Sequence, residues 1–142
     1  MNTTSAAVAS AATFVWLGMV LAISFLEAPL KFRAPGVTVP IGLGIGRLVF
    51  RALNLVETVL AVVLIVAVAT GAATAPVIGL TAAVAAVLLA QLAVVRPWLN
   101  RRSDRVLAGE EGPRSRSHLA YVALEVVKVG VLITLGVLLA AV

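Results

Sequence analysis

Four long apolar stretches, separated by prolines, glycines and basic residues, dominate this sequence. Each is long enough to cross the hydrocarbon core of a bilayer, which takes about 20 residues of α-helix. They predict helices over about residues 7–28, 47–70, 76–95 and 117–142. Only 12% of the residues are charged, against roughly 25% in a soluble domain, so most side chains must face lipid. The sequence therefore predicts one all-α domain over residues 1–142, an integral membrane four-helix bundle built from two hairpins.

The charges of the connecting segments predict the orientation. The predicted loops 29–46 and 96–116 are basic, whereas the short connection 71–75 carries no charge. Basic residues in short loops mark the cytoplasmic side, so the net charge of +5 indicates topology and not nucleic-acid binding. We expect a multi-pass protein of the cell membrane with both termini outside and its basic loops near anionic lipid headgroups. Trp98 and Tyr121, near the same boundary, are expected to anchor the interface.

The first predicted loop is unusual because residues 34–46 are apolar yet rich in proline and glycine. This composition predicts an extended or re-entrant stretch at the membrane interface. One interpretation is a flexible loop without a ligand. The other is a lipid-phosphate site in which the backbone N–H groups of Gly44 and Gly46, at a helix N-terminus, bind the headgroup beside Arg47.

The two halves of the chain resemble each other weakly. A shift of 71 positions lays residues 47–57 over residues 118–128, and the first and third predicted helices both end at a proline, Pro29 and Pro97. The shift pairs Phe50 with Tyr121, Asn54 with Glu125, and Glu57 with Lys128. Two helices per half give the halves one orientation, which predicts a parallel repeat about the membrane normal. Chance matching of Leu, Val and Ala in apolar segments is the alternative.

Polar residues recur on one face of the second and fourth predicted helices, because spacings of three and four residues share a face. They are Arg47, Phe50, Asn54 and Glu57 on the second helix, with Arg51 adjoining, and His118, Tyr121, Glu125 and Lys128 on the fourth. Glu57 and Lys128 should lie at one depth near the middle of the bilayer. An unpaired charge there costs at least about 2.5–3.5 kcal/mol. We therefore predict a Glu57–Lys128 pair across the two helices, with Glu125 meeting Arg51 or Asn54.

Three further polar residues, Gln91 on the third helix and Ser24 and Glu27 on the first, are placed to complete a polar interior open to the cytoplasm. Trp16 lies deeper in the first helix and is expected to serve packing alone. The polar residues have two interpretations. They fix helix register through a buried ion pair, or they form a site for a ligand, a proton or an ion.

The residue types limit the chemistry. The chain has no cysteine and a single histidine, His118, so it lacks thiolate ligands and cannot build a site that needs two imidazoles from one chain. We accordingly predict no cofactor, no metal site and no catalytic residues. Proton transfer by His118, Tyr121 and Glu125 is a weaker, enzymatic alternative.

Residues 92–102, at the end of the third helix, and His118 followed seven residues later by Glu125 carry a family resemblance. The second half of the chain resembles the transmembrane protein 205-like family of small four-helix membrane proteins linked to metal-drug resistance. The resemblance implies export or sequestration of a small compound. The chain also resembles copper-resistance D-like and protoporphyrinogen-oxidase-type four-helix proteins, which bind copper or haem through membrane histidines. One histidine and no cysteine argue against that reading.

Three functions remain open from the sequence. The first is a small transporter or binding protein for a polar, cationic or amphiphilic compound, acting as a homodimer or in a larger membrane complex. The second is a non-catalytic subunit or lipid-binding scaffold of a larger complex. The third is a haem- or metal-binding membrane oxidoreductase.

Overall fold

The computed structural model describes residues 1–107 and 116–141, and these residues form helices joined by short connections. The first span joins α1 (Thr3–Val20), a π-helical segment η1 (Leu21–Glu27) and α2 (Ala28–Lys31); then follow α3 (Val39–Thr70), α4 (Ala75–Ala90), a second π-helical segment η2 (Gln91–Val95), α5 (Arg96–Leu107) and α6 (Arg116–Ala140). Within these described residues, four helices are long and apolar enough to cross a membrane. The prediction of an all-α four-helix architecture is therefore confirmed.

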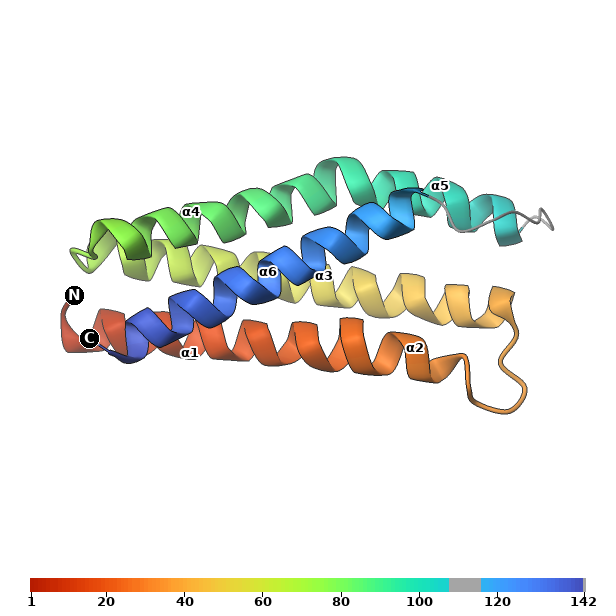
Figure 1. Cartoon of the computed structure of the whole chain (residues 1–142), viewed down its shortest axis with the longest axis horizontal. Helices are drawn as coiled ribbons and strands as arrows, with labels where there is room; N and C mark the ends of the chain where they lie inside the picture. Colours follow the sequence, from red (N-terminus) through yellow and green to blue (C-terminus); the bar gives the residue numbers. More distant parts are fainter. Residues whose placement is uncertain (108–115, 142) are drawn as a thin grey trace.

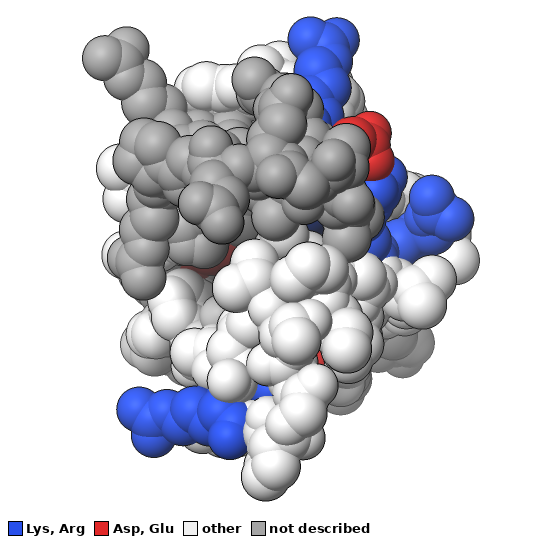
Figure 2. Space-filling view, turned by 90° about the vertical axis from the view of Figure 1, so that its right-hand side faces the viewer, with Lys and Arg blue, Asp and Glu red and all other residues white. Residues whose placement is uncertain are grey.

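The helices run alternately up and down the long axis of the molecule (Figure 1). Both termini and the short α3–α4 connection lie at one end, which we call the terminal end. The α2–α3 connection and the free end of α5 lie at the other, which we call the basic end (Figure 1). Viewed from the basic end, Lys and Arg side chains lie around its edge (Figure 2). In the bundle, α1 packs against α3 and α6, and α4 packs against α6 and α3.

The start of α3 differs from the sequence prediction. The extended or re-entrant stretch predicted over 34–46 is helical from Val39 onward, eight residues before the predicted start. The Oγ1 atom of Thr38 accepts a hydrogen bond from the N–H of Ile41 (3.3 Å) and caps the helix. Pro40 lies in the first turn, where no N–H donor is needed.

Two of the glycines in α3 serve close packing and not loop flexibility. A Cβ atom at Gly42 would overlap the ring of Phe32, and one at Gly46 would lie 2.9 Å from Nζ of Lys31. The side chains that leave α2 therefore lie directly on the glycine surface of α3. A proline and glycine pattern that predicted a loop is here a smooth face of a helix.

The prolines at the ends of the first and third predicted helices do not stop them, because a π-helical segment precedes each. Proline cannot donate a backbone hydrogen bond, and its ring displaces the preceding turn. One residue before Pro29, the N–H of Ala28 donates to the carbonyl of Ile23, and before Pro97 the N–H of Arg96 donates to the carbonyl of Gln91. Each wide turn accommodates its proline. The first span begins at Thr3 and continues to Lys31, and the helix after Gln91 continues through α5 to Leu107.

The two hairpins bury equivalent positions, as the predicted parallel repeat requires. Buried residues of α1 recur 68 positions later in α4, the separation of the two prolines: Thr13 with Thr81, Trp16 with Val84 and Val20 with Leu88. Thr13 and Thr81 make the same 2.8 Å hydrogen bond, to the carbonyl four residues before each. Buried residues of α3 recur 71 positions later in α6: Asn54 with Glu125, Glu57 with Lys128, and Leu64 with Leu135.

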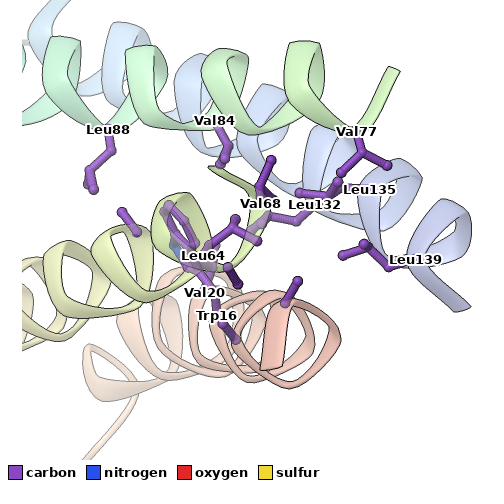
Figure 3. Packing of buried hydrophobic residues seen from close by; sticks show 14 residues of the cluster. Trp16, Val20, Leu64, Val68, Val77, Val84, Leu88, Leu132, Leu135 and Leu139 are labelled. Carbon is purple, nitrogen blue, oxygen red and sulfur yellow. The ribbon is translucent and has the colours of Figure 1, made fainter. Parts of the chain in front are cut away.

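The bundle interior changes character along its length. The apolar core gathers Trp16, Leu64, Leu132, Leu135 and other buried residues of all four spans (Figure 3). Along α6, this core begins at Leu132, towards the terminal end, while Lys128, Glu125 and Tyr121 lie nearer the basic end. Large apolar residues also cover the outside of the helices, as expected of surfaces that face lipid. A buried polar layer thus lies between an apolar core and the basic end.

Candidate functional site

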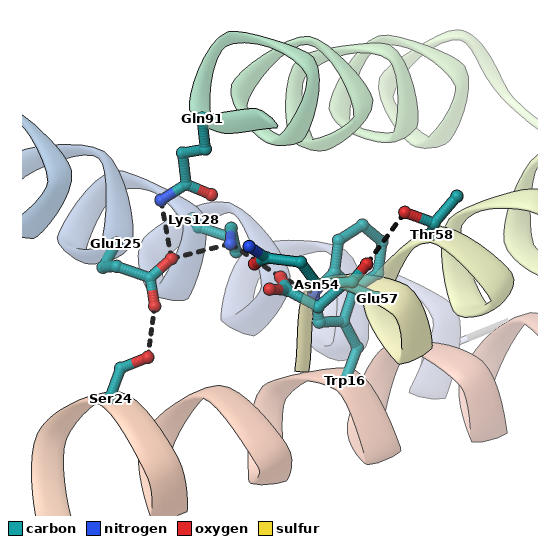
Figure 4. Close-up of polar contacts among 8 residues, drawn as sticks. All are labelled: Trp16, Ser24, Asn54, Glu57, Thr58, Gln91, Glu125 and Lys128. Atoms are coloured by element: carbon teal, nitrogen blue, oxygen red, sulfur yellow. Dashed lines mark hydrogen bonds and ion pairs between the residues drawn. The ribbon is translucent and has the colours of Figure 1, made fainter. Parts of the chain in front are cut away.

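Lys128 is the centre of the buried polar layer (Figure 4). Its Nζ atom lies 2.6 Å from Oε2 of Glu57 and 2.7 Å from Oε1 of Glu125. None of the three side chains is more than 2% exposed. The predicted Glu57–Lys128 pair across α3 and α6 is therefore present, and a second carboxylate joins it.

Three neutral side chains complete the network. The indole Nε1 of Trp16 donates to Oε2 of Glu57 at 2.6 Å. The amide Nε2 of Gln91 donates to Oε1 of Glu125 at 2.6 Å, and the hydroxyl of Ser24 donates to its Oε2 at 2.5 Å. Ser24 and Gln91 come from the two π-helical segments, so all four spans contribute to one network (Figure 4).

The charges of this network do not balance. Two carboxylates face one ammonium group, which leaves one excess negative charge when all three are ionised. Within the part of the chain that the structure describes, Oε1 of Glu57 and Oε1 of Gln91 are buried without a hydrogen-bond partner. A buried polar atom without a partner costs about 1–3 kcal/mol. The polar layer is therefore more charged and less satisfied than a structural ion pair needs to be.

The predicted partners of Glu125 are wrong. Glu125 contacts Lys128, Gln91 and Ser24 in place of Arg51 or Asn54, because Lys128 lies one turn away on the same helix and η2 brings Gln91 against it. Arg51 is exposed, and Asn54 is buried with its Oδ1 atom unpartnered among the described residues. These two residues line a cavity of about 220 Å³ with Arg47, Leu92, Arg96 and Asn100. It shares Arg47 and Arg96 with the cavity that borders Glu125.

A cavity of about 220 Å³ connects the polar layer with the basic end. Glu125 and Ser24 belong to its wall, so the network borders open space. The lining is mostly aromatic and aliphatic, and three basic side chains join it. The residues that matter here are Lys31, Arg47, Phe50, Arg96, Tyr121 and Glu125.

Tyr121 belongs to this cavity and not to the outer interface, where the sequence placed it. Its side chain is buried, with 6% exposed, and its ring packs edge-on against Phe50 with the centroids 5.8 Å apart. Its hydroxyl has no hydrogen-bond partner in the described part of the chain. Tyr121 is buried because it shares the inward face of α6 with Glu125 and Lys128.

Two cations lie beside the same aromatic ring. Nζ of Lys31 is 5.8 Å from the centroid of Phe50, and the guanidinium carbon of Arg96 is 5.1 Å from it. Arg96 also lies 4.5 Å from the centroid of Tyr121. Arg47, the third cation, pairs with Asp104 of α5 at 2.5 Å. The wall of the cavity towards the basic end is therefore positively charged.

The predicted backbone cradle for lipid phosphate is not formed. Because α3 begins at Val39, the N–H groups of Gly44 and Gly46 lie beyond its first turn and donate within the helix. Arg47, the third member of that prediction, lines the cavity through its side chain. A phosphate site built on these glycines has no free donors.

Sequence reasoning missed Trp16 and Arg96 as polar contributors. Trp16 was expected only to pack. Its depth in the first span matches that of Glu57, and this match could have predicted their hydrogen bond. Arg96 was assigned to a loop because Pro97 follows it. The predicted site residue His118 has a side chain outside the part of the structure that is described.

No protein-family model, curated protein or solved structure matches this chain. The resemblance to transmembrane protein 205-like proteins therefore stays an expectation from the sequence. The described part of the chain has the fold of a multi-pass membrane protein, with four helices long and apolar enough to span a membrane. The candidate site is identified from its geometry alone.

Proposed function

We propose that this chain is a small transport or binding protein of the cell membrane that takes up an amphiphilic compound at its polar interior. In this proposal both termini lie outside and the basic end faces the cytoplasm, following the distribution of basic residues. Four helices enclose little volume, so we expect it to act as a homodimer or in a larger membrane complex. The observation that carries the proposal is the position of Glu125, which belongs both to the buried network and to the cavity wall.

A purely structural role explains this arrangement poorly. One Glu–Lys pair is enough to fix the register of two helices, and Glu57 with Lys128 supplies it. Adding Glu125 brings an excess negative charge into a layer where uncompensated charge is costly. Glu125 adds an unbalanced charge to the network and borders the cavity. Binding of a compound in that cavity explains its presence better than helix register does.

The substitution Glu125→Gln tests the proposal, because it removes the excess charge while keeping the size of the side chain. The remaining Glu57–Lys128 pair is balanced, so we expect the variant to fold and to unfold at the same or a higher temperature. Uptake should change by about tenfold or more, equivalent to about 1.4 kcal/mol of transition-state binding, because the cavity wall loses a charge.

The assay uses the full chain in phosphatidylcholine vesicles, with dansyl-labelled undecanoate and a rhodamine-type lipophilic cation as probes. Glu27→Gln is the matched control, since Glu27 is a half-buried carboxylate outside the network, 3.9 Å from Lys31. A folded Glu125→Gln variant with wild-type uptake would show that the network is only structural. A wild-type chain that neither binds nor takes up either probe would also refute the proposal.

A further inference from the structure

We infer that the cavity at the basic end binds the acidic headgroup of an amphiphilic anion, a carboxylate or phosphate carried on an apolar chain, and that Arg96 and Tyr121 bind this headgroup. The inference rests on the proposed function and names the chemical class of its compound. It follows from unpartnered donors, from the charge balance of the cavity wall and from the apolar remainder of the lining.

Arg96 and Tyr121 supply unpartnered hydrogen-bond donors to one cavity. Nε and Nη2 of Arg96 and the hydroxyl of Tyr121 are buried, and none has a hydrogen-bond partner among the described residues. The guanidinium group lies over the tyrosine ring, 4.5 Å from its centroid, so these donors are close together. Carboxylate and phosphate oxygens are the acceptors that a guanidinium group binds most strongly.

The charge balance of the wall favours an anion. Glu125 is the one acidic residue of the lining, against Lys31, Arg47 and Arg96, and it shares Lys128 with Glu57. Arg47 is paired with Asp104. Lys31 has a carboxylate 3.9 Å away, that of Glu27. Arg96 makes no ion pair in the described part of the chain, and it shares the Phe50 ring with the like-charged Lys31. An anionic headgroup between Lys31 and Arg96 would satisfy both cations.

The rest of the lining suits an apolar chain. Phe25, Phe32, Leu43 and Val122 are among the lining residues. Phe25 of η1 and Val122 of α6 are also 39% and 40% exposed on the outer surface, so the cavity wall reaches the surface that would face lipid. A cavity of about 220 Å³ is smaller than the roughly 300–1,000 Å³ of pockets for whole drug-sized ligands. It fits a headgroup and the start of a chain whose remainder lies among the lipids.

Direct binding to the full chain in phosphatidylcholine nanodiscs tests this inference. The probes are dansyl-labelled undecanoate, a lysophosphatidate with a dansyl-labelled chain, and a trimethylammonium amphiphile with a chain of equal length. Inorganic phosphate serves as competitor. We expect both anionic amphiphiles to bind saturably, the cationic one to bind about tenfold more weakly or not at all, and inorganic phosphate to compete poorly.

Variants locate the headgroup. Arg96→Gln should weaken binding of the anionic probes by about tenfold or more, the usual effect of losing a hydrogen bond to a charged group. Tyr121→Phe should weaken it by about threefold to tenfold. Arg51→Gln is the matched control, since Arg51 is exposed and does not line this cavity. Arg96→Lys keeps the charge but loses the paired donors, so it should bind with intermediate affinity even if Arg96→Gln fails to fold.

The outcomes separate the inference from the proposed function. Binding of the lysophosphatidate alone, or of the undecanoate alone, supports the inference and identifies the headgroup. Equal or tighter binding of the cationic probe overturns the inference but leaves the proposed function standing. Full competition by inorganic phosphate, or wild-type binding by a folded Arg96→Lys variant, also overturns it. Failure of all probes both to bind and to be taken up refutes the two together.

Discussion

Glu57 and Lys128 occupy equivalent positions of the two hairpins, 71 residues apart, and their side chains contact each other at 2.6 Å. Phe50 and Tyr121, with the same separation, also touch, edge to face. Equivalent residues of a twofold arrangement meet only near the axis that relates the two copies. In the predicted parallel repeat, both pairs would lie close to the axis that relates the two hairpins, where opposite charges at equivalent positions replace the repulsion that identical residues would give.

The central ammonium group should be the least replaceable part of the network. Lys128→Met leaves Glu57 and Glu125 buried together without a cation, and breaking a buried pair in this way costs about 3–5 kcal/mol. Thermal unfolding in detergent, followed by the helical circular dichroism signal, should show a large loss of stability. Glu125→Gln should show none, and equal effects of the two substitutions would contradict the charge count.

Exchange of the two axial charges should fail in the native background. In the double variant Glu57→Lys with Lys128→Glu, the new carboxylate lies one turn from Glu125 and repels it. Adding Glu125→Gln removes this repulsion, so the triple variant should recover half or more of the lost unfolding temperature. A double variant as stable as the native chain would show that Glu125 does not depend on Lys128.

The close contact of α3 with Phe32 predicts different effects at neighbouring glycines. Gly42→Ala places a methyl group where the Phe32 ring lies and should cost about 1–3 kcal/mol of stability. Gly44→Ala is the matched control, because a Cβ there meets no atom within 4 Å, and it should be neutral or stabilising by up to about 1 kcal/mol. Equal unfolding temperatures for the two variants would contradict the helical start of α3.

The two roles of the Trp16 indole, packing in the core and hydrogen bonding to Glu57, can be tested separately. Trp16→Phe keeps most of the packing but removes the hydrogen bond to Glu57, which should cost about 1–3 kcal/mol. Trp98→Phe, at an exposed tryptophan, is the control and should leave stability unchanged. Since the chain has two tryptophans, the control variant also reports the fluorescence of Trp16 alone, which should shift when Lys128 is replaced.

The sequence correctly predicted the features that depend on the length of an apolar segment and on the depth of a residue along its helix. Twenty apolar residues specify a span, and counting residues from a common boundary placed Glu57 opposite Lys128. The errors arose where tertiary contacts override local preference. Pro29 and Pro97 predicted helix ends, but wide turns before them keep the helices continuous. The rotation of each helix about its own axis is fixed by packing, so the partners of Glu125 were not predictable from spacing alone.

The two π-helical turns have a consequence for how such a chain can vary. Each holds an inserted residue relative to regular α-helix, and one residue rotates everything beyond it by roughly 100°. Because both hairpins carry the insertion just before an equivalent proline, their basic ends turn together and stay matched. Deleting one inserted residue alone would rotate the basic end of that span relative to the other spans. The buried leucines of the apolar core would keep their positions. The rotation of the basic end is thus set at the two π-helical turns, independently of the apolar core towards the terminal end.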